Sequence, residues 1–236
     1  MTTIASNLQR VHERIAAACA AAHRDVNEVT LLAVSKTFDC EMVREACAAG
    51  QRAFGENYLQ EAVEKIALLR DLPLQWHCIG PIQSNKTRLV AAHFDWAHTV
   101  DRLKTAQRLS QQRPEGMAPL QVCIQVNIDG GPTKAGVAPP LALALAREVA
   151  RLPRLALRGL MTIPEPAGDF AAQKAVHLRA KALFDALREA GLALDTLSMG
   201  MTADLEAAIA AGSTMVRVGT AIFGARFKSP PPEGRE

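Results

Sequence analysis

Residues 31–37 read LLAVSKT, an apolar run that stops abruptly on the amine of Lys36. A short apolar run that ends at a polar step is typical of a buried strand. In a barrel of parallel strands, the side chains at the carboxyl ends of the strands face the bound ligand. The stretch therefore predicts a first strand that presents Lys36 to a ligand, at the point where a Schiff base would form.

Similar apolar, β-branched runs recur along the chain between longer stretches that are rich in Ala, Leu and Arg and have a helical period. This alternation is typical of successive βα units in a parallel sheet. The expected strands cover 30–34, 53–55, 75–79, 96–99, 121–126, 157–161, 196–199 and 215–218. The expected helices cover 40–49, 58–69, 85–92, 102–112, 140–151, 169–190 and 203–210, and a further helix over 4–22 precedes the first strand.

Eight strands, each with a helical neighbour, favour an α/β fold of the closed (β/α)8 TIM barrel type over an open sheet. The length of 236 residues is near the lower end for that fold, and a hydrophobic content of 49% is enough for one sizeable core. We expect a single domain over 1–228, with the helix 4–22 across the outside or bottom of the barrel. The proline-rich segment 229–236 is expected to be a disordered tail.

Composition excludes several classes of function. The net charge is only +3, basic and acidic residues are mixed along the helices, and aromatic residues make up 4%, so nucleic acid is not an expected partner. Five cysteines without a C-x-x-C pair indicate neither a disulfide framework nor a zinc site, and the histidines lack metal-ligand spacing. The start of the chain does not resemble a signal peptide, and no long apolar run is present, so we expect a cytoplasmic, soluble protein with no membrane partner.

Polar residues follow several of the expected strands and should meet in one pocket. Glycines and hydroxyls after the last two strands, with Ser198 and Thr220 as donors, are typical of an anion cup, and phosphate sites recur at this place in barrels. An amine opposite a phosphate site indicates a ligand with both a carbonyl and a phosphate. Pyridoxal 5′-phosphate fits, and so does a sugar-phosphate aldolase substrate. The alternatives are a solvated lysine at a strand end and ordinary turn chemistry in the cup.

A set of motifs in one order resembles the YggS/PROSC family of pyridoxal phosphate homeostasis proteins. The motifs are LAVSKT (32–37), FGENY (54–58), WHCIGPIQSNK (76–86), QVN (125–127), KAG (134–136), RGLMTI (158–163), LSMGM (197–201) and VRVGTAIFG (216–224). Thr202 stands where the family often has serine, and the loop 129–134 is individual to this chain. Lys134 in that loop is either a surface charge or a gate near the pocket.

The resemblance implies a barrel like that of alanine racemase, with pyridoxal 5′-phosphate bound to Lys36. It further implies that Ser198, Gly219 and Thr220 hold the phosphate and that Arg217 lies beside the pyridine nitrogen. Asn57 and His77 are implied more weakly, as residues that line the ring. No metal ligand and no catalytic residue are expected.

Whether such a protein uses its cofactor or only holds it depends on acid and base groups. An arginine donates only, so Arg217 favours an unprotonated pyridine nitrogen and a weak electron sink. Racemisation needs a base on each face of the substrate, and Lys36 serves one face. In alanine racemases the second base is a tyrosine from an additional domain. Here the chain ends soon after the eighth strand, and the sole tyrosine, Tyr58, is expected to pack at the pocket rim.

These points predict a non-catalytic carrier or buffer, which the resemblance implies acts in intracellular pyridoxal 5′-phosphate homeostasis. Without the additional domain that pairs the racemases, a monomer is the expected state. The alternatives are an enzyme, either a pyridoxal-phosphate-dependent amino-acid racemase or a Schiff-base aldolase, and an interaction protein with a vestigial cofactor.

Overall fold

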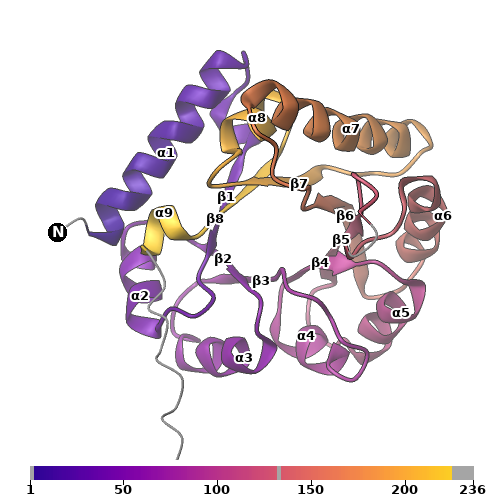
Figure 1. The fold of residues 1–236 in the computed structure, drawn as a ribbon. Helices are drawn as coiled ribbons and strands as arrows, with labels where there is room; N and C mark the ends of the chain where they lie inside the picture. Colours follow the sequence, from indigo (N-terminus) through magenta and orange to yellow (C-terminus); the bar gives the residue numbers. More distant parts are fainter. Residues whose placement is uncertain (1–2, 132–133, 225–236) are drawn as a thin grey trace, which may run out of the picture.

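Eight parallel strands close into a barrel in the computed structural model, which describes residues 3–131 and 134–224 (Figure 1). Each strand pairs with the next in the chain, and β8 pairs with β1. The strands are β1 (Thr30–Val34), β2 (Ala53–Glu56), β3 (Gln75–Cys78), β4 (Trp96–Val100), β5 (Leu120–Val126), β6 (Leu155–Thr162), β7 (Thr196–Met201) and β8 (Met215–Val218). The predicted (β/α)8 fold is therefore confirmed.

The helices form a ring around the barrel and agree with the predicted ranges to within about two residues at either end. They are α1 (Ile4–Ala21), α2 (Cys40–Ala48), α3 (Leu59–Leu68), α4 (Thr87–His93), α5 (Leu103–Gln112), α6 (Pro139–Ala150), α7 (Phe170–Glu189), α8 (Leu205–Ala210) and α9 (Thr220–Phe223). A short 3-10 helix (Val26–Glu28) precedes β1. Sequence reasoning did not predict α9, whose four residues are too few for a hydrophobic period. The tail predicted over 229–236 lies outside the described residues.

Helix α1 lies along the outside of the ring, beside α8 and α9 (Figure 1). Ile4, Leu8, Val11 and Ile15 recur at helical spacing and are buried against the barrel's outer layer. The amide of Asn7 donates to the carbonyl of Ile222 at 2.7 Å, which ties α1 to α9. Of the two predicted positions for this helix, outside or bottom, the outside position is the observed one.

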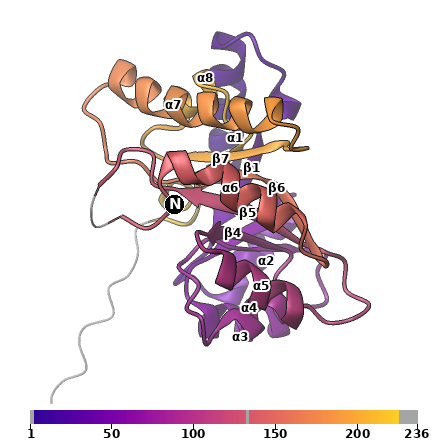
Figure 2. The same ribbon diagram turned by 90° about the vertical axis from the view of Figure 1, so that its right-hand side faces the viewer.

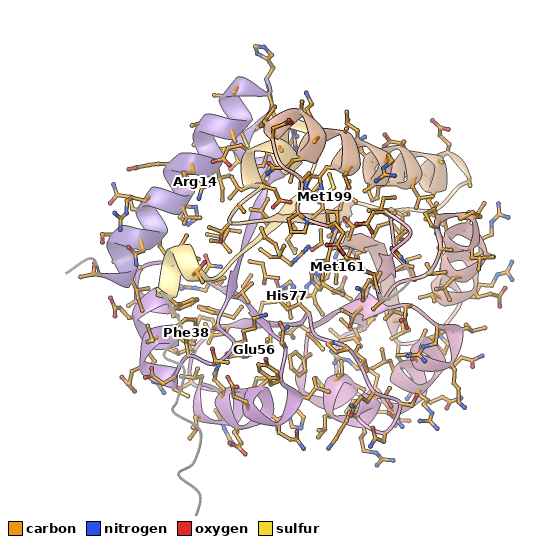
Figure 3. The ribbon with its side chains drawn as sticks, viewed as in Figure 1. Arg14, Phe38, Glu56, His77, Met161 and Met199 are labelled. Carbon is orange, nitrogen blue, oxygen red and sulfur yellow. The ribbon has the colours of Figure 1, made fainter. Side chains whose placement is uncertain are left out.

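Side chains alternate between the barrel interior and the helix layer, because successive residues of a strand point to opposite faces. On β1, Leu32 packs inside the barrel with Ala53 and Met215, whereas Ala33 belongs to the large outer core. The same alternation turns His77 inward, and Figure 3 shows His77 within the ring of strands. Because both faces of the sheet are covered, most strand residues are buried.

The loops that follow β5 and β6 extend from the same side of the barrel (Figure 2). Parallel strands carry all their carboxyl ends to one side, so this is the side where a barrel places its functional residues. Within 3–131 and 134–224, no helix is long and apolar enough to cross a membrane. The same residues contain no group of three or more His, Cys, Asp or Glu side chains that could hold a metal ion.

Candidate functional site

A cavity of about 300 Å³ lies at the carboxyl ends of the strands. Its polar wall contains five of the seven residues that the sequence singled out. These are Lys36 after β1, Asn57 after β2, Arg217 of β8, and Gly219 and Thr220 at the start of α9. Thr202, Met201 and Ala203 line the cavity from the end of β7, and Val34, Ile79 and Ile163 provide apolar walls.

Lys36 is positioned through the residue that precedes it. Ser35 points away from the barrel interior, where its hydroxyl donates to Glu56 Oε1 at 2.7 Å. The carbonyl of Ser35 accepts a bond from Lys65 Nζ at 2.9 Å, and its N–H donates to the carbonyl of Gly55 at 3.0 Å. All three hydrogen-bonding groups of Ser35 are thus engaged, which fixes the direction in which Lys36 leaves the strand.

The residue that follows Lys36 is held as well. Thr37 has a φ of +67°, in the left-handed region that a β-branched residue rarely adopts. Its N–H donates to Glu61 Oε1 at 2.8 Å, and Lys65 Nζ lies 3.2 Å from the same oxygen. We call Glu56, Glu61 and Lys65 the acid–lysine clamp, because together they hold the backbone on both sides of Lys36.

The clamp has an uncommon electrostatic character. Lys65 is 4% exposed and Glu56 is fully buried, on the α3 side of the sheet (Figure 3). Burial raises the pKa of Glu56, although Lys65 and the Ser35 hydroxyl act in the opposite direction. A buried pair of this kind depends on its hydrogen bonds, because charge is costly away from water. Sequence reasoning missed the clamp, although Lys65 falls on the apolar face of the predicted helix 58–69.

Arg217 forms the floor of the cavity and is 4% exposed. Its guanidinium donates to Ser198 Oγ at 2.8 Å and to the carbonyl of Thr162 at 2.9 Å. Burial lowers the pKa of Arg217 to about 10, which still leaves the side chain charged at neutral pH. Because two directional bonds fix the plane of the guanidinium, the remaining N–H groups have a defined orientation.

The structure places Ser198 and His77 away from the cavity wall. Ser198 is fully buried between Arg217 and His98, and His77 is fully buried against Trp96, with a ring separation of 5.1 Å. Both side chains point inward as the alternation requires, but they lie one layer below the strand ends. Thr202, four residues after Ser198, supplies the hydroxyl at the cavity instead.

Hydrogen bonds to Asp204 hold the turn that contains Thr202. Asp204 accepts a bond from the N–H of Met201 at 2.6 Å and one from His177 Nε2 at 2.9 Å. Burial alone would raise the pKa of Asp204, but the hydrogen bonds from His177 and Met201 outweigh it and lower the pKa below 3.8. The carboxylate therefore stays ionised and keeps the turn in place.

Lys134 borders a second cavity of about 280 Å³, which shares Asn57, Ile79 and Ile163 with the first. Its amine lies 3.1 Å from Glu165 and donates to the carbonyl of Ile163 at 3.1 Å. Lys134 thus lies beside the pocket and pairs with an exposed carboxylate, and its role as a surface charge or as a gate stays a prediction. The neighbouring residues 132–133 of the loop 129–134 lie outside the described part.

The lack of a side chain at Gly80 also shapes the site. A Cβ atom at this position would lie 2.3 Å from the carbonyl oxygen of Asn57, so only glycine allows the two loops to approach this closely. Asn57 is thereby held at the cavity with its Oδ1 buried and without a hydrogen-bond partner among the described residues. A buried acceptor of this kind is suited to a ligand donor.

The fold and the site define a member of the alanine racemase N-terminal domain class, whose sequence pattern matches residues 6–227. Alanine racemase from Clostridium difficile has a similar fold, with a TM-score of 0.72 at 16% identity over 92% of this chain and 57% of that one. At that identity the likeness concerns the fold alone.

Closer relatives identify the family. The pyridoxal phosphate homeostasis protein of Pseudomonas aeruginosa is 61% identical over 226 residues, which cover 96% of this chain and 97% of that protein. The protein of the same name from Escherichia coli is 53% identical over 229 residues, with 96% and 98% covered. The structure of PipY from Synechococcus elongatus with PLP bound has a TM-score of 0.80 at 37% identity, with 94% and 100% covered. The chain belongs to the pyridoxal phosphate homeostasis protein family.

Proposed function

We propose that the chain binds pyridoxal 5′-phosphate as a Schiff base on Lys36 and acts in intracellular homeostasis of this cofactor without catalytic turnover. The observation that carries the proposal is the meeting of Lys36, Arg217 and two threonine hydroxyls around one cavity. Curated relatives over half identical carry the homeostasis name, and a related structure contains the cofactor, which supports the same conclusion.

The cavity has a suitable group for each part of the ligand. The amine of Lys36 matches the aldehyde, whose condensation forms one C=N bond and releases one water. Thr202, Thr220 and the space left by Gly219 suit the phosphate, because hydroxyls and glycine backbone are common phosphate partners. A Cβ atom on Gly219 would lie 3.2 Å from the carbonyl oxygen of Val34, so the wall is already tight there.

The ring would lie between the apolar walls and Asn57, whose buried Oδ1 has capacity for a donor. When bound, the cofactor supplies an aldehyde and a conjugated ring that can accept electrons. Arg217 limits the capacity of the ring to accept electrons. It is a permanent donor, so it matches an unprotonated pyridine nitrogen and leaves the ring a weak electron sink. This supports a role in holding the cofactor.

The acid and base groups at the cavity support the same choice against the racemase alternative. Racemisation requires a second base opposite the lysine. Among the described residues that line the cavity, Lys36 is the sole candidate base, because the wall contains no Tyr, His, Cys, Asp or Glu. Tyr58 is 54% exposed and is not among the lining residues.

We further propose a cytoplasmic monomer with 1–228 as its domain. All five cysteines are free, which suits a reducing compartment. Sedimentation velocity would test the monomer, and a stable dimer over a wide concentration range would contradict it.

The proposed binding is tested by titrating purified protein with pyridoxal 5′-phosphate and following the near-visible absorption of an imine. We expect the band in the wild type and in Lys104→Ala, a control at an exposed lysine, and its loss in Lys36→Ala. Incubation of the loaded protein with L-alanine or D-alanine should leave chirality unchanged. Steady racemisation would favour the enzyme instead.

A further inference from the structure

A continuous line of hydrogen bonds runs through the barrel interior and ends at Arg217. Gln75 Oε1 lies 3.0 Å from His77 Nε2, and His77 Nδ1 lies 2.9 Å from His98 Nε2. His98 Nδ1 lies 3.1 Å from Ser198 Oγ, which accepts from Arg217 at 2.8 Å. The proposed function uses only Arg217 from this line, and the two histidines and the serine have no role in it so far.

Four of the five members of the line, all except Gln75, are shielded from water. His77, His98 and Ser198 are fully buried, and Arg217 is 4% exposed. These four residues lie at inward-facing positions of four different strands, β3, β4, β7 and β8. A buried polar group without a partner is costly, so each donor in this line needs an acceptor.

This requirement decides the direction of the protons. Arg217 can only donate, so one lone pair of Ser198 Oγ is occupied. If His98 donated from Nδ1 to Ser198, the Ser198 proton would have no acceptor, since among the described residues Ser198 Oγ bonds only to His98 and Arg217. Ser198 must therefore donate to His98 Nδ1.

The position of the Ser198 proton decides the positions of the other protons in the line. With Nδ1 as an acceptor, neutral His98 carries its proton on Nε2 and donates to His77 Nδ1. His77 then carries its proton on Nε2 and donates to Gln75 Oε1. Each contact in the line then joins one donor to one acceptor, and all the bonds point away from the cavity, in the order Arg217, Ser198, His98, His77 and Gln75.

We infer that His98 is a positioning residue for the cofactor site, because it turns the Ser198 hydroxyl so that a lone pair faces Arg217. This inference rests on the proposed function, in which Arg217 faces the pyridine nitrogen. Without the acceptor at His98 Nδ1, the Ser198 hydroxyl is free to rotate its proton toward the guanidinium. Arg217 would then lose one of the two bonds that fix its plane.

Both histidines stay neutral in this arrangement. Burial lowers the pKa of His77 to about 3 and holds the pKa of His98 well below its ordinary value, where the nearby His77 and Arg217 act in the same direction. Among the described residues, His77 and Arg217 are the titratable groups whose charges act on His98. Arg217 is therefore the one charge on the line over the whole physiological pH range.

Nuclear magnetic resonance of the imidazole nitrogens tests the direction without any substitution or ligand. We expect His77 and His98 to be in the Nε2–H tautomer, with no titration of either between pH 5 and pH 8, as follows from the range in which an ordinary histidine titrates. His98 protonated on Nδ1, or a histidine of this pair that becomes charged in that range, would overturn the inference.

A matched pair of substitutions tests the positioning role. Asn carries its polar atoms as many bonds from Cβ as imidazole Nδ1, and Gln as many as imidazole Nε2. His98→Asn thus keeps an acceptor for Ser198 and loses the bond to His77, whereas His98→Gln keeps the bond to His77 and loses the acceptor. Each variant loses one buried bond, so a merely structural role predicts similar effects.

We expect His98→Asn to bind pyridoxal 5′-phosphate as the wild type does, and His98→Gln to bind about tenfold more weakly with a shifted absorption band. Equal affinities and equal spectra in the two variants would overturn the inference. If either variant fails to fold, the tautomer of the wild-type protein still decides. If the wild type itself forms no imine, the proposed function fails while the direction of the line remains testable.

Discussion

Lys65 Nζ lies 2.7 Å from Glu56 Oε1, and both side chains are buried behind the strand that presents Lys36. The same amine also bonds to the carbonyl of Ser35. A second lysine thus stabilises the backbone beside the proposed Schiff-base lysine without itself lining the cavity. The site thereby separates two positions, since Lys36 lines the cavity while Lys65 neutralises a buried carboxylate.

Removal of the Lys65 amine should be strongly destabilising. Lys65→Met keeps the unbranched stem, one atom shorter, but leaves the charge of Glu56 buried and unpaired, and breaking a buried pair in this way costs about 3–5 kcal/mol. We expect the denaturant midpoint to fall accordingly. The double variant Glu56→Gln with Lys65→Met should recover part of the loss, because no buried charge remains. A midpoint unchanged in Lys65→Met would show that the pair does not stabilise the fold.

Thr202 should act on the phosphate and not on the rest of the ligand. Thr202→Ala removes one hydroxyl from the cavity wall, and we expect about tenfold weaker binding of pyridoxal 5′-phosphate. Binding of pyridoxal, which lacks the phosphate, should be unaffected, and Thr202→Ser should behave as the wild type. Equal losses for the two ligands in Thr202→Ala would place the phosphate elsewhere.

Arg217 should not be replaceable by lysine. An ammonium group is a compact charge and cannot reproduce the planar geometry that joins Ser198 Oγ and the Thr162 carbonyl. We expect Arg217→Lys to bind the cofactor at least about tenfold more weakly, although the charge is kept. Isothermal titration would measure this. An affinity like that of the wild type would mean that charge alone, and not orientation, matters at this position.

Asp204 gives the fold a dependence on acid pH. Its pKa is lower in the folded protein than the ordinary value of 3.8, so its contribution to stability is complete above pH 3.8 and is lost as pH falls through the folded pKa. We therefore expect Asp204→Asn to be less stable than the wild type at neutral pH, and the difference to shrink in strong acid. A difference that stays constant from pH 7 to that acid range would contradict the assignment.

Sequence reasoning predicted the barrel because its strands and helices are local patterns with a short period, whereas the roles of Arg217 and Asn57 were implied by the resemblance to a family. The strand before Lys36 and the helical repeats are local patterns, and they gave the element ranges. Ser198 and His77 illustrate the limit. Both are polar and both point inward, but only the closed barrel shows that they lie a layer below the cavity, and that Thr202 takes the place at the wall.

The acid–lysine clamp was unpredictable for a different reason. Glu56, Glu61 and Lys65 are ordinary charged residues in sequence, and charged residues usually face water. Glu56 and Lys65 are buried because α3 packs against the strand ends, and this packing depends on residues far apart in the chain. Apolar wall residues such as Ile79 and Ile163 follow directly after strands, and a rule that included such positions would have found them.

The most direct test of the central claim is to locate the bond to the cofactor. Protein loaded with pyridoxal 5′-phosphate is reduced with borohydride, which fixes an imine as a stable amine, and is then digested and analysed by mass spectrometry. The account predicts one major adduct, on Lys36. An adduct chiefly on Lys65, Lys134 or surface lysines, with Lys36 unmodified, would contradict it.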